Sequence, residues 1–250
     1  ITKIDIIIQM SKKLRIGGAS GFWGDSVVAT PQLLNGNDLD FIVYDYLAEI
    51  TMSIMARARA KDATKGYAVD FVSSVLKLNL KQIAEQKVKI LSNAGGVNPE
   101  ACADAIRELI KELKLDLKVS VVLGDDLISQ KNKFSELNTK EMYSNEAFPA
   151  EDKIASINAY LGAFPIAEAL NGGADIVITG RSVDSAVTLG ACIYTFGWNE
   201  KEYDKLAAGS LAGHIIECGT QSTGGNFTDW ELVSKDLHQI GYPIVEVSED

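Results

Sequence analysis

Residues 175–185 read Asp175-Ile-Val-Ile-Thr179 followed by Gly180-Arg-Ser-Val-Asp-Ser185, and this succession of segments decides the fold. A short run of β-branched residues predicts a buried strand, and the polar turn after it leads into a segment with helical periodicity. The same succession occurs four more times. The other strand segments are Leu14-Arg-Ile16, Phe41-Ile-Val-Tyr44, Val88-Lys-Ile-Leu91 and Lys118-Val-Ser-Val-Val-Leu123.

Strands that alternate with helices predict crossover connections and therefore a mainly parallel sheet. The strand segments are nearly continuous in apolar residues, which is typical of a sheet covered by helices on both faces. We therefore expect an α/β fold of Rossmann-like layers. Two regions depart from the rhythm. Residues 129–158 are polar and predict an insertion or lid loop, and the last third, from Leu206 on, is glycine-rich and weakly periodic.

Two helices have recognisable beginnings. Asn98 as N-cap, with Pro99 in the first helical position, predicts a helix that starts there. Asp45 stands where the N-cap of an earlier helix belongs. The periodicity of that earlier helix predicts Ile50 and Ile54 on its buried face.

The ends of the chain point to a domain over residues 10–250. Met10-Ser-Lys-Lys-Leu14 reads like a natural start, so we expect residues 1–9 to be upstream or non-native sequence. The last residues, Val245-Glu-Val-Ser-Glu-Asp250, look like a strand with no closing element after it. We therefore expect the domain to be a fragment, truncated at its C-terminus.

The 250 residues are 46% hydrophobic and 23% charged, which is ordinary for a folded domain, and their net charge is −10. That charge repels a phosphate backbone and the basic residues are scattered, so we expect no nucleic-acid partner. No apolar run approaches the roughly 18 residues that span a bilayer, so we expect no membrane partner. Cys102, Cys192 and Cys218 form no zinc-binding spacing and predict reduced thiols in the cytoplasm.

In open parallel sheets, ligands bind beyond the carboxyl ends of the strands, and all five turns would open there. Because glycines let backbone N–H groups approach an anion closely, the first turn is a candidate ligand-binding loop. A tight strand–helix turn without a ligand is the alternative. The spacing matches neither a dinucleotide fingerprint nor a P-loop. The candidate residues of this loop are Gly17, Gly18, Ser20, Gly21 and Asp25.

Carboxylates follow the second and fourth strands. Asp45 is either a helix N-cap or, with Glu49 one turn later, part of a pair suited to acid–base chemistry or to a hard metal ion. Asp125 and Asp126 are candidates for holding Mg²⁺ or a ligand hydroxyl, and a solvated loop is the alternative. The turn after the third strand adds the ligand-binding candidates Asn93, Gly95 and Gly96.

Arg181 follows a glycine at the end of the fifth strand and precedes Asp184 and Ser185. A guanidinium in that place suits a carboxylate or a phosphate, because it can donate two parallel hydrogen bonds. A structural Arg–Asp pair is the alternative. The turn therefore adds a candidate anion site.

His214 is followed by Glu217 and Cys218 at helical spacing, which places the three side chains on one face. Histidine is the usual general acid–base group, so His214 and Glu217 are catalytic candidates. The alternative is a histidine that is merely hydrogen-bonded in place. Neither a GxSxG nucleophile elbow nor a zincin motif is present.

Six longer motifs stand out along the chain: Arg15–Ser26, Asp45–Arg57, Ser92–Pro99, Ala159–Pro165, Asp175–Ser185 and Ala208–Gly219. In this order and spacing they resemble the acyclic terpene utilisation protein A (AtuA) family. The resemblance covers the chain from about Lys13 to its end. It implies a part in the catabolism of acyclic terpenes and branched acids through CoA thioesters. It also implies a longer protein, since family members continue past Gly241–Val247.

These observations favour an enzyme of the lyase or hydratase type that acts on an acyl-CoA or a carboxylic acid. In this hypothesis His214, Glu217, Asp125 and Asp184 carry the proton chemistry, while Arg181 and the glycine turns bind the anionic end. CoA would be part of a thioester substrate, and a divalent metal such as Mg²⁺ stays open as cofactor. The alternative is a non-catalytic binding or assembly subunit that supports a carboxylase. A homo-oligomer stays open as well.

Overall fold

The computed structural model describes residues 13–25, 27–137 and 139–249, so the expected extension over residues 1–9 lies outside the described residues. Six strands in this part of the chain form one sheet in the order β4-β5-β3-β2-β1-β6. Strands β1 to β5 pair in parallel, and β6 runs antiparallel to β1. The strands are β1 (Lys13–Gly18), β2 (Phe41–Tyr44), β3 (Lys89–Ser92), β4 (Val119–Val122), β5 (Ile176–Thr179) and β6 (Ile244–Ser248). The predicted mainly parallel α/β sheet is confirmed.

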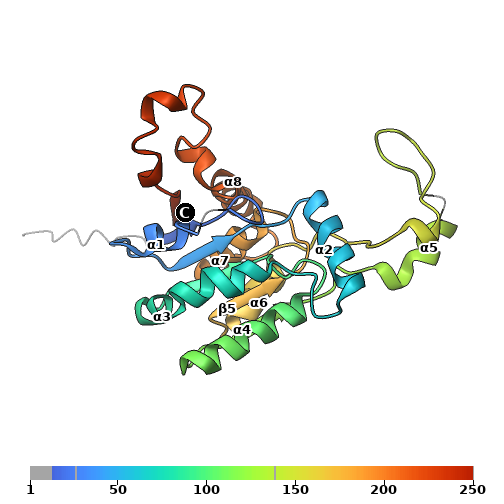
Figure 1. The fold of residues 1–250 in the computed structure, drawn as a ribbon, viewed down its shortest axis with the longest axis horizontal. Helices are drawn as coiled ribbons and strands as arrows, with labels where there is room; N and C mark the ends of the chain where they lie inside the picture. Colours follow the sequence, from blue (N-terminus) through green and yellow to red (C-terminus); the bar gives the residue numbers. More distant parts are fainter. Residues whose placement is uncertain (1–12, 26, 138, 250) are drawn as a thin grey trace, which may run out of the picture.

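Helices cover both faces of the sheet (Figure 1). Alternate side chains of one strand enter different cores: Ile42 and Tyr44 pack with the first group of helices, whereas Phe41 and Val43 pack with the second. The first group is α1 (Ala29–Leu34), α2 (Glu49–Lys61), a π-helical turn (Phe71–Leu76), α3 (Lys77–Gln86) and α4 (Pro99–Leu113). The second group is α6 (Phe164–Asn171), α7 (Ala186–Phe196) and α8 (Tyr203–Ile216).

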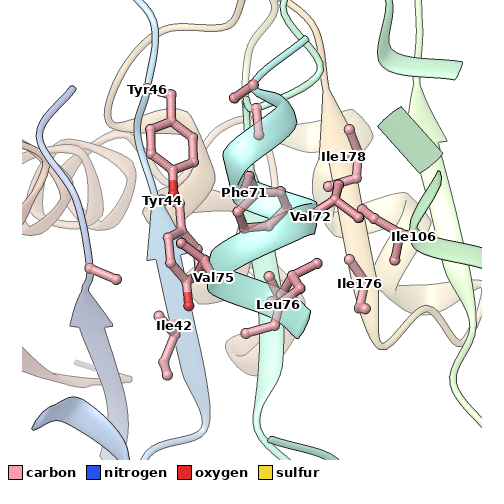
Figure 2. Close-up of a cluster of buried hydrophobic side chains, with 14 of the residues drawn as sticks. Ile42, Tyr44, Tyr46, Phe71, Val72, Val75, Leu76, Ile106, Ile176 and Ile178 are labelled. Atoms are coloured by element: carbon pink, nitrogen blue, oxygen red, sulfur yellow. The ribbon is translucent and has the colours of Figure 1, made fainter. Parts of the chain in front are cut away.

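The first core is built around Phe71, which is fully buried at the start of the π-helical turn (Figure 2). Its ring meets the ring of Tyr44 edge-on, with 5.1 Å between the centroids, and that of Tyr46 at 5.7 Å. The buried Tyr44 hydroxyl is 2.8 Å from the Thr30 hydroxyl, so its polar atom is satisfied. This core fixes the chain where it leaves β2.

Helix α4 begins as predicted, with Asn98 at the N-cap position and Pro99 as its first residue. The Asn98 side chain does not cap the helix, however. Its Nδ2 donates to the carbonyl oxygens of Ala63 at 2.9 Å and Lys65 at 2.8 Å. Asn98 therefore ties the loop after α2 to the start of α4.

Helix α2 begins later than the sequence predicts. Its N-cap residue is Ala48, so the interpretation of Asp45 as N-cap is wrong. The predicted buried face is also wrong: Ile50 is 69% exposed and Ile54 is 46% exposed, whereas Met52 and Met55 are buried. Asp45 is buried instead, and its carboxylate accepts a hydrogen bond from Asn93, which follows the neighbouring strand β3.

Two segments extend from the layered body (Figure 1). Residues 129–158, predicted as an insertion, carry α5 (Lys131–Glu136) and short 3-10 turns, and they project beyond α2. The residues after α8 form 3-10 turns before the chain returns to the sheet as β6. Over the described ranges, each helix is too short or too polar to cross a lipid bilayer.

Candidate functional site

The carboxyl ends of the parallel strands bring together polar side chains that are far apart in sequence. Ser20 follows β1, Asp45 follows β2, Asn93 follows β3, Asp125 follows β4 and Arg181 follows β5. All five residues are buried. We call them, with Glu49, Tyr160 and Asp184, the strand-end cluster.

Asp45 is the buried acid at the centre of this cluster. Its Oδ1 accepts hydrogen bonds from Asn93 Nδ2 at 2.5 Å and from the Leu47 N–H at 3.4 Å. Burial raises the pKa of Asp45 to about 7, and the charge of Asp184 adds to this, while Asn93 and Arg181 act against it. Within the described residues Oδ2 accepts no hydrogen bond.

Asn93 is itself held in place. Its Oδ1 accepts a hydrogen bond of 2.8 Å from the Tyr46 N–H, so the amide must direct its Nδ2 toward Asp45. On the other side, the Ser20 hydroxyl donates to the Asp45 carbonyl oxygen at 3.1 Å. The backbone and the side chain of Asp45 are therefore both fixed by neighbouring strand ends.

Arg181 is the buried cation of the cluster, with only 4% of its side chain exposed. Its Nη1 donates to Asp184 Oδ1 at 2.6 Å and to the Ser182 carbonyl oxygen at 3.0 Å. Burial alone would lower the pKa of Arg181, but the hydrogen bonds and charges of Asp184 and Tyr160 together outweigh it and raise that pKa. The Arg–Asp pair that the sequence left as an alternative is therefore present.

The other guanidinium nitrogen of Arg181 points to two residues from distant segments. Nη2 lies 3.1 Å from the Tyr160 hydroxyl and 3.4 Å from Glu49 Oε1, and the Tyr160 hydroxyl also donates to Glu49 Oε1. The guanidinium carbon stacks 4.1 Å from the centre of the Tyr160 ring. Sequence reasoning missed Tyr160, although the residue lies inside the Ala159–Pro165 motif.

Asp125 holds the backbone of Arg181 in place. Its Oδ2 accepts the Arg181 backbone N–H at 2.8 Å and Asn158 Nδ2 at 2.9 Å, and Gly180 leaves the space that this carboxylate fills. Burial raises the pKa of Asp125. These contacts give Asp125 a positioning role toward Arg181.

Asp126 has contacts of its own. Its Oδ2 lies 3.4 Å from Arg59 Nη1, and its Oδ1 accepts the Ile128 N–H at 3.0 Å. Asp125 and Asp126 therefore have separate hydrogen-bond partners, while both border one small cavity. Across the described ranges, no group of three or more His, Cys, Asp or Glu side chains is arranged to hold a metal ion.

The glycines of the candidate loops lie where backbone segments approach closely. A Cβ on Gly18 would lie 2.5 Å from the Ile216 carbonyl oxygen, and one on Gly21 would lie 2.8 Å from the Cys218 carbonyl carbon. Gly95 faces the Thr179 carbonyl oxygen and Pro99 in the same way. Close packing therefore accounts for glycine at these three positions, because a larger side chain would collide with neighbouring atoms.

The remaining candidates of the loops have local contacts. Gly17 packs against the Leu33 side chain, and Gly96 has a φ of +54° and packs against Met55. Asp25 Oδ2 accepts the Gly21 N–H at 3.0 Å, which closes the first turn. Ser185 precedes α7 and abuts Gly213 of α8. The ligand-binding roles of these residues stay predictions.

His214 and Glu217 form a pair at the rim of the cluster. His214 Nδ1 is 2.8 Å from Glu217 Oε1, with the histidine side chain 75% exposed and the glutamate 12% exposed. Burial raises the pKa of Glu217, His214 lowers it and the charge of Asp184 raises it. Glu217 thus borders the cluster, whereas His214 lies on the solvent side.

Cavities lie beside the cluster. One of about 330 Å³ between α2 and residues 155–158 is lined by Arg59, Asp126 and Asn158, among others. A smaller one of about 120 Å³ includes Asp125 in its lining and shares Arg59 and Asp126 with the first. A third, of about 350 Å³, lies among residues 223–240 and shares no residue with the cluster.

The fold and the cluster define a parallel α/β protein with a buried acid and a buried, charge-paired arginine at the carboxyl ends of its strands. Residues 14–250 match the acyclic terpene utilisation family protein AtuA. The chain belongs to this family, which connects it with acyclic terpene utilisation. No curated protein and no solved structure gave a match.

Proposed function

We propose that this protein is an enzyme of acyclic terpene breakdown that adds or removes a proton on a carboxylate or acyl-CoA substrate, as a lyase or hydratase does. The single observation that carries the proposal is Asp45, a buried carboxyl group with a pKa of about 7 that lies within the electrostatic reach of the buried Arg181. A carboxyl group with that pKa is present in both protonation states at neutral pH, so it can serve as general base and as general acid.

The geometry supports a division of roles. Asp45 Oδ2 exchanges a proton with the substrate or with the water that adds to it, and Asn93 and Leu47 hold the other oxygen. Arg181 offers positive charge to the oxygen of the substrate that gains electron density. Asp125 fixes the backbone of Arg181. Glu217 and His214 contribute a second proton-carrying pair at the rim.

The test is turnover of branched unsaturated acyl-CoA thioesters and free acids, followed by mass spectrometry for gain or loss of water. We expect the full-length wild-type protein to convert at least one of them and Asp45→Asn to lose at least about a hundredfold in rate. Because Asp45 must be ionised to act as base, the wild-type rate of the base-dependent step should rise through pH 7.

The matched control is Asp116→Asn, which changes the same side chain on an exposed loop before β4. It should keep the wild-type rate. An Asp45→Asn variant that turns over as fast as Asp116→Asn would refute the catalytic role. Ligand-dependent thermal stabilisation with no product from any thioester or acid would instead favour the non-catalytic binding or assembly subunit.

A further inference from the structure

Glu49 and Arg181 make an unusual ion pair, because one partner is buried and the other is not. The Arg181 side chain is 4% exposed, whereas that of Glu49 is 79% exposed and reaches inward only with its carboxylate. Tyr160, half of whose surface is exposed, donates its hydroxyl to the same oxygen, Glu49 Oε1. Two donors from separate segments thus converge on one carboxylate oxygen at the protein surface.

We propose that Arg181 Nη2 and the Tyr160 hydroxyl form the receptor for the carboxylate of an acyclic acid ligand, and that Glu49 occupies this receptor until the ligand displaces it. The proposal rests on the proposed function only in taking the ligand to be an acid. It goes further by naming the atoms that bind the acid group and the side chain that competes with it.

Three features make Glu49 replaceable. Its contact with Arg181 is the longer of the two ion pairs, 3.4 Å against 2.6 Å for Asp184, so Asp184 stays as the permanent partner. A ligand carboxylate would replace one negative charge by another, which leaves the charge balance around the buried arginine unchanged. Finally, Glu49 is the first residue of α2, where an acidic side chain is favourable in solvent as well.

The receptor groups are held by neighbours other than Glu49. Asp125 holds the Arg181 backbone and Asp184 holds Nη1, so the direction of Nη2 is set without Glu49. The Tyr160 ring lies against the guanidinium plane, which keeps the hydroxyl beside Nη2. Loss of Glu49 should therefore leave a preformed site.

The test measures binding and requires no turnover. The probe is 3-methylbut-2-enoate, a branched acid with one isoprene unit, and its primary amide is the neutral control. Binding to the full-length protein at pH 7.5 is followed by NMR titration of the ligand. Because the Glu49 side of the ion pair is exposed, we expect the pair to close only a few times more often than it opens. Glu49→Gln should therefore lower the Kd for the acid about three- to fivefold.

Tyr160→Phe should raise that Kd about tenfold, because the hydroxyl donates to a charged acceptor. The combined variant Glu49→Gln/Tyr160→Phe should lose the gain in affinity that Glu49→Gln alone produces. The primary amide should bind neither the wild-type protein nor any of these variants. Both altered side chains are exposed, and thermal unfolding confirms the fold of each variant. A gain in affinity cannot arise from misfolding, which makes Glu49→Gln the decisive variant.

An acid that binds wild type and Glu49→Gln equally well, or an amide that binds as well as the acid, would overturn the proposal. So would an acid that binds neither protein. The same titration on Asp45→Asn separates the two proposals: binding there without turnover supports the receptor, whereas turnover there refutes only the catalytic role of Asp45.

Discussion

The buried carboxyl group of Asp45 predicts a pH-dependent stability that a single substitution should reverse. In Asp45→Asn the side-chain oxygen can still accept the hydrogen bonds of Asn93 and Leu47, whereas an NH2 group replaces Oδ2. The variant therefore removes the ionisable group while keeping the shape of the side chain and the oxygen that accepts the hydrogen bonds.

The magnitude follows from the pKa of Asp45, which is about 7 in the folded protein against an ordinary value of 3.8. As the pH rises from 4 to 7, the unfolded chain has lost this proton and the folded chain still holds it, so wild-type stability falls. This difference between the folded and unfolded pKa values lowers the free energy of unfolding by at most about 4 kcal/mol. Above pH 7 the loss is complete, and it is recovered as the pH falls toward 4.

The amide of the variant has its own cost, since an unpaired N–H group in a buried place costs about 1–2 kcal/mol. At pH 8.5 the variant should therefore be more stable than wild type by about 2 kcal/mol. At pH 5 the Asp45 carboxyl of the folded wild-type protein is protonated, so most of the stability advantage of the variant is gone. The wild-type protein should then be as stable as the variant or more stable. The two stability curves should converge or cross on acidification.

The assay is urea unfolding, followed by fluorescence, at half-unit steps between pH 5 and pH 8.5. Asp125 and Glu217 also have raised pKa values, so the wild-type curve alone is a mixture, and the difference between wild type and variant isolates Asp45. A difference for Asp45→Asn that stays flat with pH, or a variant less stable than wild type at pH 8.5, would refute the reasoning.

Three further predictions concern packing and the rim. Leu80→Ala should destabilise the protein by about 3 kcal/mol in urea unfolding, because Leu80 is fully buried in α3. Gly213→Ala should lower the melting temperature although alanine favours helices, because its Cβ would lie 2.8 Å from the Ser185 backbone; Gly162→Ala, with nothing within 4 Å, should not. In the turnover assay, His214→Gln should cost less than Asp45→Asn, because solvent surrounds most of the His214 side chain.

Most of the fold could be predicted because its signals are local. The runs Phe41–Tyr44 and Asp175–Thr179 are apolar and β-branched, and each became a strand of the parallel sheet. Pro99 after Asn98 likewise marks the start of α4 wherever the helix packs. The start of α2 could not be found in this way. Asp45 is the better N-cap by residue type, yet its carboxylate accepts a hydrogen bond from the distant Asn93 and the helix begins after Ala48.

The candidate site was predicted in outline, by the rule that ligands bind beyond the carboxyl ends of parallel strands. Asp45, Asn93 and Arg181 were named on that basis, and the structure brings them into one buried cluster. His214 was named for its chemistry, yet its side chain lies on the solvent side because α8 turns it outward. Residue type indicates what a group can do, but its exposure depends on packing.

The sequence by itself determined the alternation of strands and helices, the parallel sheet and the edge of the sheet at which polar residues collect, because each of these follows from patterns a few residues long. Only the tertiary structure decided which groups meet there. Tyr160 and Glu49 are separated by 111 residues, and Arg181 and Glu49 by 132. Their hydrogen bonds, and the burial that raises the pKa of Asp45, exist only once separate segments have packed together and excluded water.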